Sequence, residues 1–430
     1  MKKLFNDKIM NVLVFILILE MILGGLGKTF YLPIRITIFA VALVYSLLYI
    51  KINNIAIKKE YYIYIGIIMG YAILGSVIGL LRGNNIRNIV ADANVFVTTL
   101  YLIILAAYIN NNIMKLNKIT NLVVIFAVLI AIVTSVMYFG SHLYLRNGYN
   151  IVVDFDAAEK FLNIGLISGL LYHNQFARVY FTSGIFMEVA LAICLVRAAK
   201  SNEGKFISYD TIAIAILSLG IFASSTRGYW VGAGVVVALT ILFVKCDKKA
   251  LAKSLVLTIL VLGSVYVLYP RNVRDQLSKR LVSTTEFTEN KVDLSNSVRK
   301  TQFNHLVSKI KEKPIIGFGF GGQIPEYEQE TGRGPMNFEL YYLELVFKTG
   351  IVGFLALLAI LIYIARDYIR ALKNPINFQL QYLVIGWGIA FLAVFVSGGT
   401  NPYLAGAHGF FVVIMLLTAI CESNKGLAIK

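Results

Sequence analysis

The chain has 430 residues, of which 58% are hydrophobic and 15% carry a formal charge. Because an ordinary soluble domain has roughly 25% charged residues, this composition excludes a soluble globular enzyme and indicates an integral membrane protein. The formal net charge is +17, but the basic residues cluster between apolar runs, as membrane topology requires, so nucleic acid is not an expected partner.

Twelve apolar segments follow one another along the chain, each typical of a transmembrane helix. The sequence therefore predicts an all-α integral membrane protein with about twelve transmembrane helices, forming a single polytopic domain over residues 1–430. Two long connections, 140–178 and 270–339, are predicted as external loops, the larger one between helices nine and ten. The predicted segments are approximately 10–27, 35–50, 61–81, 88–108, 119–139, 179–196, 211–225, 229–245, 254–269, 340–365, 378–398 and 405–421.

The orientation follows from the basic residues of the short connections. One side of the predicted membrane domain collects 20 Lys and Arg, whereas the other side has 5. Positive residues favour the cytoplasmic side, so both termini of this multi-pass protein are predicted in the cytoplasm. The polar features then face outside, where nucleotides are absent, and a lipid-linked donor that is already activated fits such a site.

Two arginines are candidate phosphate ligands, since a guanidinium group offers a planar fork to phosphate oxygens. Arg227 lies in a short polar turn, 224–228, between two apolar segments, and the alternative is an arginine at the membrane interface beside Tyr229 and Trp230. Arg299 belongs to a predicted amphipathic helix in the second loop, on one stripe with Phe303, Leu306 and Ile310. Its alternative is an ion pair with a nearby acid.

Three carboxylates are also candidates. Glu339, at the mouth of the tenth segment, can act as a general base, although glutamate at a helix N-terminus also simply suits the dipole. Glu188 and Asp92 are functional candidates because acids within membrane segments are rare, and hydrogen bonding between helices is the alternative. Glu344 and Lys348, four residues apart, are expected to neutralise each other.

Cysteines and glycines indicate no further chemistry. Cys194, Cys246 and Cys421 form no CxxC pair, and no histidines accompany them at metal-ligand spacing, so neither disulfides nor a metal site are predicted. The glycine-rich run 317–322 is not read as a nucleotide loop, because no strand-then-helix unit flanks it.

Taken together, these residues resemble the O-antigen ligase and polymerase family of bacterial envelope enzymes, over about 178–417. The resemblance lies in the turn around Arg227, in the run from Arg299 through 314–319, and in the run from Glu339 to Gly350 and Gly353. Arg178 with the following glycine and acid is a fourth match, while Glu339 stands where ligases usually have histidine. The resemblance implies a C-type glycosyltransferase architecture.

The function that this resemblance implies is polymerisation of oligosaccharide repeat units. Glycan would pass from an undecaprenyl pyrophosphate carrier to a lipid-linked acceptor sugar, without metal or cofactor. Arg178, Arg227 and Arg299 are expected to bind the pyrophosphate, and Glu339 to orient or deprotonate the acceptor. Membrane lipid, a flippase and a chain-length regulator of the same pathway are the expected partners. The alternatives are an O-antigen ligase that uses a lipid or protein acceptor, and a polytopic transporter or lipid flippase.

Overall fold

The computed structural model describes residues 5–25, 27, 33–145, 167–173, 176–200, 208–244, 248–268, 274, 294–373, 378–399, 401–424 and 428–429. The described part is mainly helical. Its helices are α1 Asp7–Leu23, α2 Ile34–Asn53, α3 Lys59–Leu81, α4 Ile86–Val97, α5 Tyr101–Ile109, α6 Ile113–Leu145, α8 Ile185–Lys200, α9 Tyr209–Ala223, α10 Arg227–Phe243, α11 Lys248–Leu268, α13 Leu294–Glu312, α14 Pro325–Thr331, α15 Tyr341–Lys373, α16 Phe378–Ser397 and α17 Ala407–Ser423, with two short 3-10 helices, η1 Thr98–Leu100 and η2 Tyr403–Ala405. The strands are β1 Ile57–Lys58, β2 Ile167–His173, β3 Phe176–Phe181 and β4 Ala428–Ile429.

Each of the twelve predicted apolar segments contains a helix of this structure. Within the described residues, six helical stretches are long and apolar enough to cross a membrane, and four further apolar helices are shorter. The prediction of a helical membrane protein is therefore supported, and the number of twelve crossings remains a prediction. The six long stretches are Ile34–Asn53, Lys59–Leu81, Ile86–Ile109, Ile113–Phe139, Tyr341–Lys373 and Gln379–Ser397.

Local signals in the sequence fix several helix ends. The side chain of Asn6 accepts a hydrogen bond from the backbone N–H of Ile9 and begins α1, and Ser208 begins α9 in the same way through Thr211. Such caps satisfy backbone donors that have no partner within the helix. At the C-terminal end of α2, Asn54 adopts the left-handed conformation that is common after the last residue of a helix.

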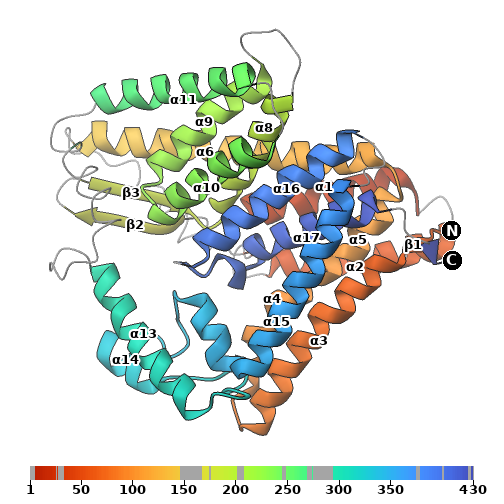
Figure 1. Cartoon of the computed structure of the whole chain (residues 1–430), viewed down its shortest axis with the longest axis vertical. Helices are drawn as coiled ribbons and strands as arrows, with labels where there is room; N and C mark the ends of the chain where they lie inside the picture. Colours follow the sequence, from red (N-terminus) through yellow and green to blue (C-terminus); the bar gives the residue numbers. More distant parts are fainter. Residues whose placement is uncertain are drawn as a thin grey trace.

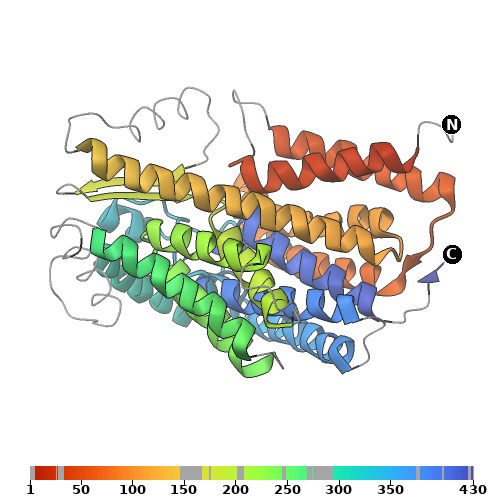
Figure 2. The same cartoon turned by 90° about the horizontal axis from the view of Figure 1, so that it is seen from above.

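The two termini lie together on one side of the helical bundle, and the β2–β3 hairpin lies on the opposite side (Figures 1 and 2). Strand β1 pairs with β4 in an antiparallel register, so Ile57 faces Ile429. The buried ammonium group of Lys58 donates hydrogen bonds to the carboxylate of Glu422, at 3.3 Å, and to the carbonyl oxygen of Cys421. These contacts join the beginning of α3 to the end of α17.

The helix predicted for residues 179–196 is wrong at its beginning. Residues Phe176–Phe181 form β3, which pairs with β2, and helix α8 starts only at Ile185. The residues Val179, Tyr180 and Phe181 are β-branched or aromatic and suit a strand as well as an apolar helix. Hydrophobicity alone could not separate the two, because short apolar runs are ambiguous.

Helices α13 and α14 pack beside the first part of α15 and form a separate lobe of the structure (Figure 1). Its small core contains Leu306, Ile324, Tyr327, Phe338 and Phe347. The predicted stripe of α13 is only partly correct: Leu306 is fully buried, whereas Phe303 is 49% exposed. The buried face of α13 rests on α14 and on the segment before α15.

Helix α15 is broken at Gly350, where the backbone is not helical (φ 61°, ψ −166°). Residues 314–321, here called the glycine loop, fill the break. The N–H groups of Phe318 and Gly319 donate to the last carbonyls of the first half of α15, and those of Ile351 and Val352 donate to carbonyls of the loop, at 2.6–3.1 Å. The glycine-rich run thus completes the backbone hydrogen bonding of a discontinuous helix.

The glycine loop also rests on α3 and α4. Phe320 and Gly319 pack against α3, where a Cβ atom on Gly75 would lie 2.5 Å from the Phe320 ring. Asp92 on α4 accepts a hydrogen bond from the N–H of Gly321 (2.6 Å) and forms an ion pair with the buried Lys348 (2.7 Å). Lys348 also pairs with Glu344, so the predicted pairing of these two residues is confirmed.

Candidate functional site

Glu339 lies between two arginines just before α15 begins. The guanidinium group of Arg299, on α13, contacts one carboxylate oxygen of Glu339 through Nε and a terminal nitrogen, both at 2.9 Å. Arg333, on the segment that follows α14, donates a hydrogen bond to the other oxygen, and this bond raises the pKa of the Arg333 guanidinium group. We call these three residues the arginine cluster. It brings two predicted site residues, Arg299 and Glu339, into direct contact.

The arginine cluster is held in place by Gln302, which is fully buried. Its side-chain oxygen accepts hydrogen bonds from the backbone N–H groups of Glu339 (2.9 Å) and Leu340 (2.8 Å). Its side-chain nitrogen donates to the hydroxyl of Tyr327 at 3.2 Å. Gln302 therefore fixes the position of the Glu339 backbone relative to α13, the helix that carries Arg299.

Arg227 is the first residue of α10 and is not one of the three residues of the arginine cluster. The preceding residues Ser224, Ser225 and Thr226 are buried, and Ser224 accepts a hydrogen bond from the N–H of Thr226 (3.3 Å). A Cβ atom on Gly228 would lie 2.9 Å from the amide nitrogen of Asn401. The Arg227 turn therefore packs against the connection between α16 and α17.

The end of α16 links the Arg227 turn with the arginine cluster. The hydroxyl of Tyr342, three residues after Glu339, donates a hydrogen bond to the backbone carbonyl of Phe395. Two residues further on, Ser397 donates to the carboxylate of Glu188 at 3.2 Å. The beginnings of α8, α10 and α15 and the end of α16 consequently meet at one end of the bundle, and the termini lie at the other.

Sequence reasoning missed Arg333 and Gln302. Arg333 lies between two glycines after a short helix, and its role depends on a turn that brings it back to Glu339. The sequence offered only one indication of the role of Gln302, namely that it follows Arg299 by one turn of the same helix. Arg178 lies in β3 opposite Leu171, and its side chain is outside the described residues, so its predicted role remains a prediction.

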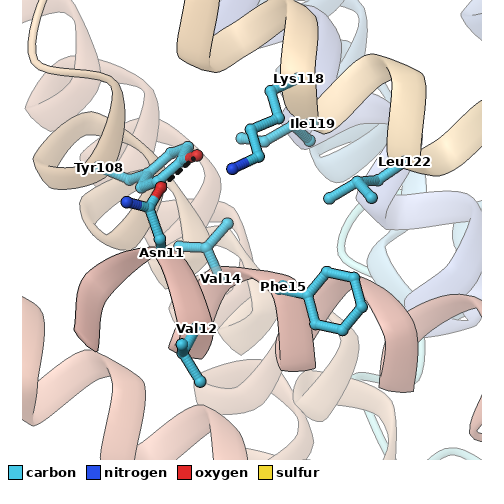
Figure 3. A pocket seen from close by; sticks show the side chains of 8 residues that line it. All are labelled: Asn11, Val12, Val14, Phe15, Tyr108, Lys118, Ile119 and Leu122. Atoms are coloured by element: carbon cyan, nitrogen blue, oxygen red, sulfur yellow. Dashed lines mark hydrogen bonds between the residues drawn. The ribbon is translucent and has the colours of Figure 1, made fainter. Parts of the chain in front are cut away.

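A cavity of about 220 Å³ lies elsewhere, between α1 and α6 (Figure 3). In it the Tyr108 hydroxyl donates a hydrogen bond to Asn11 (3.0 Å), and Lys118 points into the same space. Asn11 and Lys118 stand near the beginnings of their helices, at the end of the bundle that holds the termini. This cavity is therefore remote from the arginine cluster.

The arginine cluster is suited to anions. Two guanidinium groups face one carboxylate, so one positive charge is left over, and Arg299 and Glu339 are 22% and 21% exposed. Guanidinium forks of this kind bind carboxylate or phosphate oxygens. Among the described residues, no group of three or more His, Cys, Asp or Glu side chains could hold a metal ion.

Comparison with known proteins finds two similarities to one family. Residues 212–358 match the model of the O-antigen ligase family. The chain is also 24% identical over 418 residues to an O-antigen polymerase of Shigella flexneri. The alignment covers 95% of this chain and 94% of that protein. These matches support the resemblance of this chain to the O-antigen ligase and polymerase family. The family match and the apolar helices together indicate a bacterial membrane protein, and the family suggests a glycosyltransferase-type enzyme.

The region that matches the O-antigen ligase family model contains most of the candidate site. It runs from α9 to the second half of α15 and includes Arg227, Arg299 and Glu339. It also includes the glycine loop and the break at Gly350. The three sequence runs that carried the resemblance are therefore parts of one packed structure, in which the loop run completes the broken helix of the last run.

Proposed function

We propose that this protein polymerises oligosaccharide repeat units on the external face of the bacterial cytoplasmic membrane. It transfers a growing glycan from an undecaprenyl pyrophosphate carrier to a sugar hydroxyl on the next lipid-linked unit. The observation that carries the proposal is the arginine cluster, in which Arg299 and Arg333 share the carboxylate of Glu339 within the family match.

In the proposed reaction, the anomeric carbon of the donor leaves its carrier as the acceptor oxygen attacks it. Negative charge develops on the departing pyrophosphate, and cations held in advance at that position lower the barrier. We propose that Arg299 and Arg227, together with Arg178, supply this charge, and that Arg333 adds to it beside Arg299. Because guanidinium groups take the part that a divalent ion takes elsewhere, the reaction needs no metal.

Glu339 was predicted to orient or deprotonate the acceptor, and its ion pairs argue against deprotonation in this arrangement. Both of its oxygens are engaged by guanidinium groups, so a base role would require an arginine to leave first. We therefore propose that Glu339 orients Arg299 and Arg333 until the diphosphate replaces it, after which the carboxylate faces the acceptor. Because the side chain of Gln302 binds the backbone N–H of Glu339, it holds the Glu339 carboxylate near this position.

A small apolar cavity lies at the beginning of α15, close in sequence to Glu339. It has a volume of about 80 Å³ and begins at Tyr341 and Tyr342, directly after Glu339 and Leu340. Its lining comes from α3, α4, α15, α16, α17 and η2 and includes Leu345, Phe395 and Leu404. The cavity is far smaller than an undecaprenyl chain, so it offers room for only a few carbons of such a chain.

The proposed orientation places both termini in the cytoplasm. Lys58 and Lys115 stand near the termini, as expected for the cytoplasmic side, and the arginine cluster stands at the opposite end of the bundle. A flippase that delivers lipid-linked units and a chain-length regulator remain the expected partners.

An O-antigen ligase is the second candidate, because the matching family model carries that description. The two activities predict different surface glycans in a strain that lacks this protein. Loss of a polymerase leaves single capped repeat units on a gel of surface glycan, whereas loss of a ligase leaves none. Long chains that persist in the deletion strain would contradict both.

Transport is less well supported, although α15 is discontinuous as many transporter helices are. In transporters such breaks expose backbone groups to a substrate. Here the glycine loop occupies the break and takes up the N–H groups of Ile351 and Val352 and the carbonyls of Phe347 and Lys348. The break at Gly350 therefore serves packing rather than transport.

The catalytic proposal is tested with purified protein in nanodiscs and a lipid-linked repeat unit. Glu339→Gln removes the charge that holds both arginines, so we expect single units in place of long chains. The matched control is Glu328→Gln on the exposed face of α14, which should leave the ladder of products unchanged. A normal ladder from Glu339→Gln would contradict the role given to the arginine cluster.

A further inference from the structure

Glu188 is a fully buried carboxyl group with only half of its hydrogen-bonding capacity used. One oxygen accepts a hydrogen bond from Ser397 (3.2 Å), and the other has no partner among the described residues. Leaving such a buried group without a partner costs about 1–3 kcal/mol. An unsatisfied buried carboxyl group therefore calls for an explanation, and a ligand that is absent here is one.

A second unsatisfied group stands at the same end of α8. Ser183, two residues before the helix begins, is fully buried, and its hydroxyl also has no partner among the described residues. Two buried polar groups that lack partners at one helix end indicate a site for a hydroxyl-bearing ligand better than either would alone.

The surroundings of Glu188 are shaped for its carboxylate. Gly232 on α10 faces it so closely that a Cβ atom there would lie 2.1 Å from a carboxylate oxygen. Gly232 follows Arg227 by five residues on the same helix, and Tyr229 between them lies against Gly184 of the α8 entry. Glu188 therefore lies beside α10, one to two helical turns after Arg227.

Ser397 connects Glu188 with the other half of the site. It ends α16, whose Phe395 carbonyl accepts the hydrogen bond from Tyr342, and Tyr342 follows Glu339 by three residues. Glu188 is thereby connected through α16 with Tyr342, which follows Glu339, and through Gly232 with α10, the helix that Arg227 begins.

We propose that the unpaired oxygen of Glu188 accepts the proton of the acceptor hydroxyl, and that Ser183 helps to bind that hydroxyl group. This inference rests on the proposed function. The acceptor oxygen forms a bond to the anomeric carbon of the donor while the bond from that carbon to the pyrophosphate oxygen breaks. The electron pair of the broken bond leaves with undecaprenyl pyrophosphate, and the hydroxyl proton passes to Glu188. Such a base accelerates transfer by about a hundredfold to ten-thousandfold.

The test uses Glu188→Gln, which keeps the shape of the side chain and its hydrogen bond with Ser397 but cannot take the proton. We expect the rate of glycan transfer to fall by about a hundredfold or more. Binding of undecaprenyl pyrophosphate and the melting temperature in nanodiscs should not change. A purely structural carboxyl group would predict full activity in this variant, because glutamine keeps the shape and the hydrogen bond with Ser397, and full activity would overturn the proposal.

Two further variants keep the inference testable if Glu188→Gln does not fold. Gly232→Ala displaces the carboxylate, and its control Gly234→Ala lies on the same helix with no atom within 4 Å of the added Cβ. We expect transfer to fall at least tenfold in Gly232→Ala only. Glu188→Asp, which keeps an acid, should transfer faster than Glu188→Gln if both fold. Equal rates in the two glycine variants, or in the two Glu188 variants, would contradict the base role.

The result is separable from that of the proposed function. If the unmodified protein does not transfer glycan, or if Arg299→Lys transfers normally, the proposed function fails. If the unmodified protein transfers glycan, Arg299→Lys is impaired and Glu188→Gln is fully active, only the role of Glu188 fails.

Discussion

Gly350 and Ile315 approach so closely that a Cβ atom on Gly350 would lie 2.3 Å from the carbonyl oxygen of Ile315. The two residues join the break of α15 to the glycine loop. Gly350 also has a positive φ of 61° with an extended ψ, a conformation that only glycine adopts readily. The glycine loop, 314–321, and the residues around Gly350 therefore depend on each other, because each segment completes the backbone hydrogen bonding of the other.

Gly350→Ala should strongly reduce the amount of folded protein. The strained backbone costs about 1–3 kcal/mol, and the clash with Ile315 adds to this cost. The measurement is the melting temperature and the monodisperse yield after detergent extraction. Gly70→Ala on α3, where nothing lies within 4 Å of the added Cβ, serves as the control. Equal stability of the two variants would show that the break does not need glycine.

Gln302→Met should loosen the beginning of α15. The substitution leaves the backbone N–H groups of Glu339 and Leu340 without the acceptor that they share. A buried donor without a partner costs about 1–3 kcal/mol, so we expect a lower melting temperature and slower glycan transfer. Gln329→Met, at an exposed position of α14, controls for the loss of a glutamine. Unchanged transfer in Gln302→Met would exclude Gln302 from the support of the site.

Lys348→Met should destabilise the protein more than removal of all three charges does. The single change leaves the buried Glu344 and the partly buried Asp92 without their shared cation. Breaking a buried pair in this way costs about 3–5 kcal/mol, whereas replacing the whole group with neutral residues is often tolerated. We expect the triple variant Asp92→Asn, Glu344→Gln, Lys348→Met to recover part of the lost folded yield. A triple variant that is less stable than the single one would contradict this account.

The sequence predicted the helices well because long apolar runs report directly on membrane spans. The pairing of Glu344 with Lys348 was also predictable, since residues four apart on a helix face each other. The strand β3 was not predictable, because the same apolar residues suit both structures. Phe303 was placed on the buried face of α13 by spacing alone, and its exposure shows that the packing partner decides which face is buried.

The candidate site was predicted only in part. Arg299 and Glu339 were identified as separate candidates, but their contact joins residues 40 positions apart and depends on how α13 packs against the start of α15. Arg333 and Gln302 complete the arginine cluster and its support through the same tertiary packing. Periodicity reports on neighbours along a helix and carries no information on such long-range contacts.

The central claim is that a guanidinium fork at position 299 stabilises the departing diphosphate. The most direct measurement compares Arg299→Lys with the unmodified protein and with Lys311→Arg, an exposed position of α13, in the rate of transfer from a lipid-linked repeat unit in nanodiscs. Lysine keeps the charge but loses the two-point contact, so transfer should fall by about a hundredfold or more while the protein stays folded. Glycan chains of normal length formed at the normal rate by Arg299→Lys would contradict the claim.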